Sequence, residues 1–279
     1  MKTKNFLMCE PHFFGVDYVI NPWMSGKIGT VNRELASEQF ASLVSKIYEL
    51  GSAAIFMDPE EGLPDQVFTA NAGLIVKNLK HGGSHKAIVS KFANPERQGE
   101  EANFLKAFSQ LQLPCLATPD DKKFEGAGDA LYALDDLLFM GYGFRTDRSF
   151  VDYAYEVLSD YGIVVKPLRL INPNFYHLDT CFCPLDNGHV MLYRDAFDEV
   201  SYESIVDSYG LDEILCVNKE TADAFGCNAI SIGTDIIVND MSKEDEHKLN
   251  ARGYKIHRVP LTEFMKAGGS AKCLTLEIS

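Results

Sequence analysis

The sequence predicts an α/β fold in which about five strand–strand–helix–strand units close into a ring with the functional site near its axis. Three observations support this. Stretches with apolar residues at helical spacing end at a residue, usually Gly, that is followed by a short apolar strand. These ends recur at roughly 50-residue intervals, a period typical of repeat and propeller-like architectures. Short strands also come in close pairs ahead of the helices, which a doubly wound sheet, the alternative α/β arrangement, does not explain. The helix ends lie near Gly51, Leu113, Gly162, Gly210 and Gly253.

The first unit contains a helix over about residues 33–50. Gly51 can end this helix in a left-handed conformation, and the apolar run 53–57 then forms a strand. The helix is predicted because five apolar residues share one face, namely Ala36, Phe40, Leu43, Val44 and Ile47.

The second and third units repeat this order. A second helix begins near Pro95 and leads into strand 115–117, and a third covers 149–161 and leads into 163–165. Paired strands at 73–76 with 87–89, and at 130–133 with 137–140, precede these helices. The second helix is expected to turn four residues inward, namely Phe104, Leu105, Phe108 and Leu111.

The last units are less regular. A helix ending at Gly210 leads into strand 214–217. The final helix begins at Ser242, a plausible N-cap, and leads into strand 254–259, and residues 274–278 form a last strand.

Composition limits the class of protein. The chain has 279 residues, 46% of them hydrophobic, and a net charge of −14, which fits one globular domain over residues 1–279 and disfavours nucleic acid as a partner. Neither a signal peptide nor an apolar run of the roughly 20 residues needed to span a bilayer is present. We therefore expect a cytoplasmic protein with no membrane partner, and the sequence leaves a homo-oligomer open.

The seven cysteines are an odd number, which favours reduced thiols in such a compartment. Cys181 and Cys183 are the one close pair, but one intervening residue is not the spacing of zinc ligands. We expect neither a metal nor another cofactor.

Cys273 is the candidate nucleophile. It follows Gly268 and Gly269, which let the backbone pass close to a ligand, and it stands where a loop is predicted to enter a strand. Such a thiol needs a base, and His177 is a candidate because a nucleophile and its base need only be neighbours in space. The alternative is that Cys273 is a small buried hydrophobe.

Other segments place polar groups among apolar or glycine residues. Asp65 and Asn71 could accept hydrogen bonds from a planar group rich in N–H, and Glu125, in a glycine-containing turn, could orient His177. Arg97 and Arg145 could each bind a carboxylate with two parallel hydrogen bonds.

Together these segments resemble the guanidine-modifying superfamily of arginine deiminases, dimethylargininases and amidinotransferases. Within it, the chain is most similar to the arginine dihydrolase domain of cyanobacterial bifunctional arginine-catabolic enzymes, over nearly its whole length. The resemblance is carried by residues 17–24 (DYVINPWM), 67–73 (VFTANAG), 125–130 (EGAGDA), 176–185 (YHLDTCFCPL) and 267–276 (AGGSAKCLTL).

The resemblance implies a five-bladed α/β propeller of ββαβ units, the pentein fold, which agrees with the repeat count. It implies Cys273 as nucleophile, His177 as general acid and base, and Glu125 as the carboxylate that orients His177. The substrate would be arginine or a related guanidino compound. The residues expected to bind it are Asn21, Asp65, Asn71, Arg97, Asp129, Arg145 and Asp179.

Two departures from the family pattern favour an arginine dihydrolase, which gives ornithine, two ammonia and CO2. Asn71 stands where deiminases and dimethylargininases carry Asp, and Ala70 replaces a Glu of dimethylargininases. The alternatives are an arginine deiminase giving citrulline, a dimethylargininase, an amidinotransferase, and a non-catalytic arginine-binding protein. The cyanobacterial enzymes also carry a domain that cyclises ornithine, and we expect that activity to be absent from a chain ending at Ser279.

Overall fold

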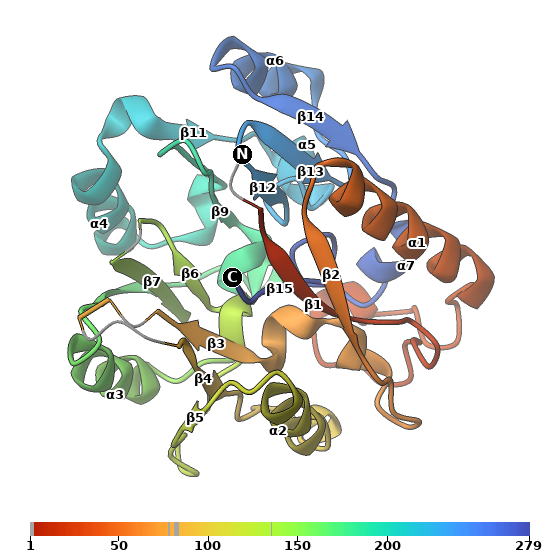
Figure 1. Cartoon of the computed structure of the whole chain (residues 1–279). Coiled ribbons are helices and arrows are strands. Elements are labelled where there is room, and N and C mark those ends of the chain that lie inside the picture. Colours follow the sequence, from red (N-terminus) through yellow and green to blue (C-terminus); the bar gives the residue numbers. More distant parts are fainter. Residues whose placement is uncertain (1–2, 78, 81–83, 135) are drawn as a thin grey trace.

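Five three-stranded sheets surround a common centre, with the long helices at the periphery (Figure 1). This computed structural model describes residues 3–77, 79–80, 84–134 and 136–279. The predicted ring of five units is confirmed, and the fold is a five-bladed α/β propeller of the pentein type. The C-terminus lies near the middle of the view, beside β15.

Every blade follows one plan. Its first two strands pair antiparallel, and a helical crossover then brings the third strand parallel to the second. The blades are β15 (Leu276–Glu277), β1 (Asn5–Cys9), α1 (Arg33–Glu49) and β2 (Ala53–Met57); β3 (Gly73–Val76), β4 (Lys86–Val89), α2 (Glu100–Gln110) and β5 (Cys115–Leu116); β6 (Ala130–Tyr132), β7 (Leu137–Tyr142), α3 (Arg148–Ser159) and β8 (Val164–Arg169); β9 (Phe182–Pro184), β10 (Val190–Leu192), α4 (Glu199–Tyr209) and β11 (Ile214–Cys216); and β12 (Ile230–Ile232), β13 (Asp235–Val238), α6 (Lys243–Ala251) and β14 (Lys255–Arg258).

Short helices connect and precede the blades. Two are α-helical, α5 (Lys219–Asp223) and α7 (Thr262–Met265). The 3-10 helices are η1 (Pro22–Met24), η2 (Pro64–Val67), η3 (Thr69–Ala72), η4 (Pro95–Arg97), η5 (Gly126–Gly128), η6 (Pro173–Phe175), η7 (Leu178–Thr180), η8 (Arg194–Ala196) and η9 (Leu211–Glu213).

Each of the five peripheral helices is followed by a residue with positive φ, as the sequence predicts for the helix that ends at Gly51. This residue is Gly in four of the five units, with φ between 77° and 85°. In the second unit it is Gln112, with φ 56°, two residues after α2 ends. The helix therefore stops at the same point of the repeat even where glycine is absent.

Two local predictions are wrong. Leu105 was expected to face inward, but it is 49% exposed, because the core face of α2 is set by the i, i+4 pair Phe104 and Phe108. The last strand was expected to begin at Leu274, but β15 begins at Leu276. Residues 271–274 form a turn instead, held by bonds such as that from Leu274 N to Ser270 O (3.2 Å).

The first blade joins the two ends of the chain. Strand β1 lies between β15 and β2, so Leu7 pairs with Leu276 on one side and with Ile55 on the other. Lys4, which is buried, contacts Asp186 (2.8 Å) and Glu277 (3.1 Å) and so ties this blade to the fourth. The ring is therefore closed by the C-terminal strand.

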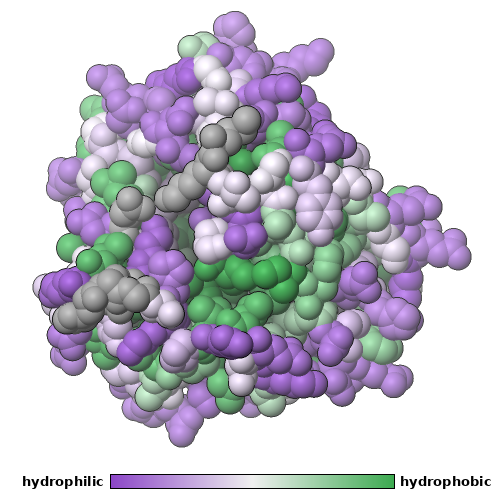
Figure 2. All heavy atoms as spheres, viewed as in Figure 1, coloured by the Kyte–Doolittle hydropathy of each residue, from purple (hydrophilic) through white to green (hydrophobic). Residues whose placement is uncertain are grey.

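Large aromatic side chains fill the interior between sheets and helices, for example Phe124 stacked on Phe150 with ring centroids 4.2 Å apart. Figure 2 shows hydrophobic residues gathered near the middle of one face and hydrophilic residues around its rim. In the described part of the chain, no helix is long and apolar enough to cross a membrane.

Candidate active site

The turn before the first strand of each blade carries polar side chains, and contacts link these turns. The turns η3 and η5 contact each other, as do η5 and η7. The turn residues of the five blades are Asn71; Glu125 and Asp129; His177 and Asp179; Asn228; and Cys273. The repeat of the fold therefore brings segments far apart in sequence to one place.

His177 and Glu125 form a buried pair. His177 Nε2 lies 2.8 Å from Glu125 Oε2, and the same oxygen accepts a hydrogen bond from Arg145 Nη1 (2.9 Å). Burial alone would raise the pKa of Glu125, but the charges of Arg145 and His177 hold it below its usual range. Glu125 therefore remains a carboxylate that can fix the imidazole.

Gly128 lets His177 approach Asn71. A side-chain carbon at Gly128 would lie 2.3 Å from Asn71 Nδ2 and 3.5 Å from His177 Nδ1, so a residue with a Cβ would collide with the amide. The imidazole thus lies beside Asn71, which lines the same cavity as Cys273.

Cys273 and Asp179 form a second buried pair. Cys273 Sγ donates to Asp179 Oδ2 at 3.2 Å, while Asp179 Oδ1 is buried without a hydrogen-bond partner. Burial raises the pKa of Asp179 to about 7, partly offset by the bond from Cys273. Burial, followed by the charge of Asp179, also raises the pKa of the Cys273 thiol well above its ordinary value. The site therefore holds a neutral thiol beside an acceptor that lacks a full set of donors.

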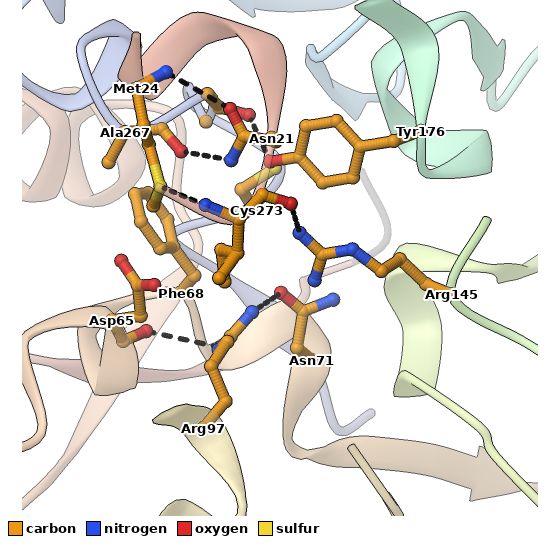
Figure 3. Close-up of a pocket in the computed structure, with 13 residues that line it drawn as sticks. Asn21, Met24, Asp65, Phe68, Asn71, Arg97, Arg145, Tyr176, Ala267 and Cys273 are labelled. Atoms are coloured by element: carbon orange, nitrogen blue, oxygen red, sulfur yellow. Dashed lines mark hydrogen bonds between the residues drawn. The ribbon is translucent and has the colours of Figure 1, made fainter. Parts of the chain in front are cut away.

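Two arginines enter the cavity from different sides (Figure 3). Arg97 contacts Glu100 through Nε (2.8 Å) and Nη2 (2.7 Å), and its Nη1 donates to Asn71 Oδ1 (3.0 Å). Arg145 bonds Glu125 and lies over the ring of Tyr176, with its guanidinium carbon 4.7 Å from the centroid. Arg97 therefore binds a carboxylate of the protein itself, that of Glu100, through two hydrogen bonds. Sequence interpretation missed this partner.

Asp65 faces the same cavity from η2. Its Oδ2 accepts from Tyr18 Oη (2.9 Å), whereas Oδ1 is buried without a partner. Burial raises the pKa of Asp65, and the charge of Arg97 opposes that rise. Such an unpaired buried acceptor is unusual in a folded protein and suits a ligand that donates N–H groups.

Four of the predicted site residues lie behind the cavity lining. Three of them contact residues that line it: Glu125 bonds Arg145, Asp179 bonds Cys273, and the ring of His177 lies 4.7 Å from that of Tyr176. Asp129 instead accepts from Thr146 Oγ1 (2.7 Å) and from the backbone N–H of Leu178 (3.0 Å), so both of its oxygens are used within the protein. The lining consists of Ile20, Asn21, Met24, Asp65, Phe68, Asn71, Arg97, Arg145, Tyr176, Ala267, Gly268, Gly269 and Cys273.

Sequence interpretation also missed Tyr176 and Asn228. Tyr176 donates to Gly268 O (2.7 Å) and so connects the histidine segment to the glycine loop before Cys273. Its position next to His177 is a signal that could have pointed to it. Asn228 lies in no recognisable motif and is found only through the fold. Among the described residues, no group of three or more His, Cys, Asp or Glu side chains is arranged to hold a metal ion.

Comparison with known proteins identifies the family. A family model for eukaryotic N,N dimethylarginine dimethylhydrolase matches residues 17–279. The bifunctional arginine dihydrolase/ornithine cyclodeaminase ArgZ of Synechocystis sp. is 42% identical over 274 residues, which cover 98% of this chain and 37% of ArgZ. The N(G),N(G)-dimethylarginine dimethylaminohydrolase of Mycobacterium tuberculosis is 34% identical over 277 residues, 99% of this chain and 86% of that protein.

A solved structure is similarly close. A crystal structure of a variant of the ArgZ N-terminal domain, covalently bound to a reaction intermediate, matches with a TM-score of 0.93 at 41% identity, covering 99% of this chain and 98% of that one. The fold and these relatives define a member of the guanidine-modifying superfamily. Within it, the chain belongs to the N,N-dimethylarginine dimethylhydrolase family. The chain spans only 37% and 38% of the length of the two bifunctional cyanobacterial relatives that it matches.

Proposed function

We propose that this chain is an arginine dihydrolase, a hydrolase that converts arginine and two waters into ornithine, two ammonia and CO2. The observation that carries the proposal is the Cys273 thiol bonded to the buried Asp179 carboxylate, in one cavity with Asn71. The similarity to ArgZ supports the choice of substrate.

The unpaired acceptors fit the guanidinium group. Asp179 Oδ1 and Asp65 Oδ1 both lack donors, and a guanidinium ion carries five N–H groups and a positive charge. Arginine in the cavity would satisfy these oxygens and lower the pKa of both carboxyls. Its charge also favours the Cys273 thiolate, because a nearby cation stabilises the ionised sulfur.

Arg145 and Arg97 are proposed to hold the substrate α-carboxylate. Most N–H groups of Arg97 are already used, by Glu100, Asn71 and Asp65 O, which leaves one N–H on Nη1 for a ligand. Arg145 donates to Glu125 and to Ile20 O (3.0 Å). We expect Arg145 to be the stronger contributor to KM, because fewer of its donors are held by charged partners.

The first half of the reaction replaces one nitrogen of the guanidinium. The thiolate attacks the central carbon, the C–N bond breaks, and His177 protonates the departing ammonia. The covalent amidino-thioether is then attacked by water, whose proton His177 accepts, and Cys273 leaves as thiolate. The product of this cycle is citrulline.

The second half repeats these steps on the neutral ureido group. Attack by Cys273 releases the second ammonia, and water opens the resulting thiocarbamate to a carbamate that loses CO2 to give ornithine. Asn71 suits a site that must hold both species, because an amide can accept from an N–H and also donate to a ureido oxygen. A carboxylate there would repel that oxygen.

Product analysis tests the proposal. The chain is incubated with arginine while ammonia, citrulline and ornithine are quantified, with Cys273→Ala as the inactive control. Two ammonia per ornithine are expected, with citrulline appearing only transiently. One ammonia per citrulline would indicate a deiminase, and transfer to added glycine an amidinotransferase. Arginine that protects Cys273 from iodoacetamide without releasing ammonia would indicate a binding protein.

Hydrolysis of dimethylarginine is the second candidate, because the family model and the M. tuberculosis relative both carry that activity in their names. Release of dimethylamine from N,N-dimethylarginine, with kcat/KM above that for arginine, would replace the first proposal. We expect the opposite order, because Ala70 and Asn71 depart from the dimethylargininase pattern.

A further inference from the structure

The fifth blade also sends a polar side chain to the site. Four of the five turns that precede a first strand carry residues singled out from the sequence. The remaining turn, before β12, carries Asn228, which is fully buried. It follows Phe225, whose φ of 57° and backbone bonds shape this turn.

The Asn228 side chain is surrounded by residues of the site. Its Oδ1 accepts from the backbone N–H groups of Ser270 and Cys273, both at 3.1 Å. Its Nδ2 donates to Asp179 O (2.9 Å) and to Cys273 Sγ (3.1 Å). The backbone carbonyl of Asn228 also accepts from Lys272 N (3.2 Å), so three residues of the turn before β15 are bonded to this one asparagine.

These contacts fix the orientation of the amide. Both partners of Oδ1 are backbone N–H donors, so rotating the amide by 180° would set its own N–H groups against them. All of the amide's capacity, two lone pairs and two N–H groups, is then used. An N–H of Asn228 therefore points at the sulfur.

Two partners of Cys273 Sγ suit two different protonation states. Asp179 Oδ2, 3.2 Å away, accepts a proton and so suits the neutral thiol. Asn228 Nδ2 donates and so suits the thiolate, for which the Asp179 carboxylate is a repulsive neighbour.

We propose that Asn228 is a positioning residue that holds the turn before β15 in place and stabilises the ionised sulfur of Cys273 through its N–H. This inference rests on the proposed role of Cys273. Its effect is distinct from that of His177, because it acts on the nucleophile before any proton reaches the leaving group.

Other charged groups act on the same sulfur. Asp179 is in direct contact with the sulfur, and the charge of Lys272 lowers the pKa of Asp179. The pKa of Tyr176 is raised by burial and also by the charge of Cys273. An experiment must therefore change Asn228 while leaving these groups in place.

Asn228→Asp is the most informative variant. It keeps an oxygen for the backbone N–H groups and replaces the N–H that faces the sulfur by an acceptor. The matched control is Asn239→Asp, the same change in a second buried asparagine, whose amide bonds Ala224 O (3.0 Å) and Leu261 N (2.7 Å). Thermal melting of both variants reports the structural cost.

The readout is the titration of Cys273 in the absence of substrate. Alkylation by iodoacetamide is followed from pH 6 to 10, with the Cys273 peptide quantified by mass spectrometry. We expect Asn228→Asp to raise the apparent pKa of this thiol and to slow alkylation at pH 7 about 10- to 100-fold, as loss of a hydrogen bond to a charged group implies. Asn239→Asp should leave the titration unchanged.

Steady-state kinetics with arginine give an independent comparison. For Asn228→Asp, kcat should fall by a similar factor while KM changes less, because the contact is with the nucleophile. An unchanged Cys273 titration in folded Asn228→Asp would overturn the inference even if the wild type turns over arginine. If Asn228→Asp raises the apparent pKa of Cys273 as expected but the wild type does not turn over arginine, the proposed function is contradicted and the inference on Asn228 stands.

If Asn228→Asp does not fold, the wild type still tests the inference. The side-chain amide protons of Asn228, observed by 15N-resolved NMR, should shift at the pH where Cys273 ionises. The shift should disappear in Cys273→Ser. Amide resonances that do not respond to this ionisation would overturn the inference.

Discussion

At the scale of single residues, Asn71 is held at both ends of its amide. Oδ1 accepts from Arg97 Nη1 (3.0 Å) and Nδ2 donates to Glu125 O (2.9 Å). Nδ2 also lies next to Gly128, where a Cβ would come within 2.3 Å of it. The bonds with Arg97 and Glu125 fix the orientation of the amide.

Asn71→Asp is expected to stop the reaction at citrulline. A carboxylate keeps the acceptor for Arg97 but sets a second oxygen against Glu125 O and against the ureido oxygen of citrulline. The measurement is the ornithine-to-citrulline ratio at full conversion of arginine. Asn71→Leu removes the donor and the acceptor together and should form neither citrulline nor ornithine. This control separates the effect of the added negative charge from the effect of removing the amide. Ornithine formed by Asn71→Asp in the wild-type proportion would contradict this explanation.

Asp179 is a carboxylate whose ionisation opposes folding. Its pKa is about 7 in the folded protein, raised by burial, compared with 3.8 as an ordinary value. Since the folded state binds the proton more tightly, wild-type stability decreases as pH rises from about 4 to 7 on account of this group, and the full cost is present above pH 7.

Asp179→Asn should therefore raise stability while abolishing activity. The gain in free energy of unfolding should be on the order of 3 kcal/mol at pH 8 and should shrink as pH is lowered to 5. Urea unfolding at the two pH values measures it. Asp245→Asn is the control. Burial alone would raise the pKa of Asp245, but hydrogen bonds from Lys248 (2.8 Å) and Thr221 (2.6 Å) hold it below its usual value, so this change should destabilise. A gain that is equal at pH 5 and pH 8 would show that titration of Asp179 is not its cause.

The sequence was a good guide to which residues lie together at the site. It was a poorer guide to which of them bond each other. Cys273, Asp179, His177 and Glu125 stand in motifs, so their proximity could be expected. The pairing of Arg97 with Glu100 could not, because it depends on η4 bending the chain before α2. Asn228 was missed since one asparagine without a motif carries no signal until the blades are in register.

At the scale of elements, the helix ends show how strongly the repeat constrains the chain. Gln112 takes a left-handed conformation that costs a non-glycine residue roughly 1 kcal/mol or more. It does so because the following strand, β5, must begin at Cys115 to lie beside β4. The position in the repeat, more than the residue type, determines the backbone conformation.

Exchanging residue types between two of these positions measures that cost. Gln112→Gly should raise the free energy of unfolding by about 0.5–1 kcal/mol, because glycine adopts positive φ without strain. Gly51→Gln should lower it by a similar amount, since no atom lies within 4 Å of the added Cβ and strain alone remains. Chemical denaturation of both variants provides the values. A loss of stability in Gln112→Gly would mean that the Gln112 side chain makes a larger contribution than its backbone strain.

Helix and strand positions were predictable where the apolar period is long, as in α1. Short elements were not, because three-residue 3-10 turns such as η5 and η7 have no period of their own. The early start predicted for the last strand has a different origin. The run from Leu274 to Ile278 alternates like a strand, but bonds from Leu274 N to Ser270 O and from Thr275 N to Lys272 O fold its beginning into the turn that carries Cys273.

At the scale of the whole molecule, closure of the ring and placement of Cys273, the proposed nucleophile, depend on the same segment. Strand β15 pairs with β1 and begins three residues after Cys273. The repeat count predicted five units. Periodicity could not show that the first blade contains strands from both ends of the chain, because no local sequence pattern indicates which strands pair across more than 260 residues.

Leu276→Ala tests whether closure positions Cys273. Leu276 is buried in β15 against Leu7, so the truncation should cost about 2–5 kcal/mol of unfolding free energy. Leu192→Ala in β10 removes an equally buried leucine from a blade formed by one continuous segment and should cost a similar amount. Hydrogen exchange then separates the two variants. Amides of residues 270–277 should lose protection in Leu276→Ala, with kcat on arginine falling in parallel, while Leu192→Ala should retain both. Equal protection of this segment in the two variants would mean that the turn bearing Cys273 is held by Asn228 and its neighbours without help from the closing strand.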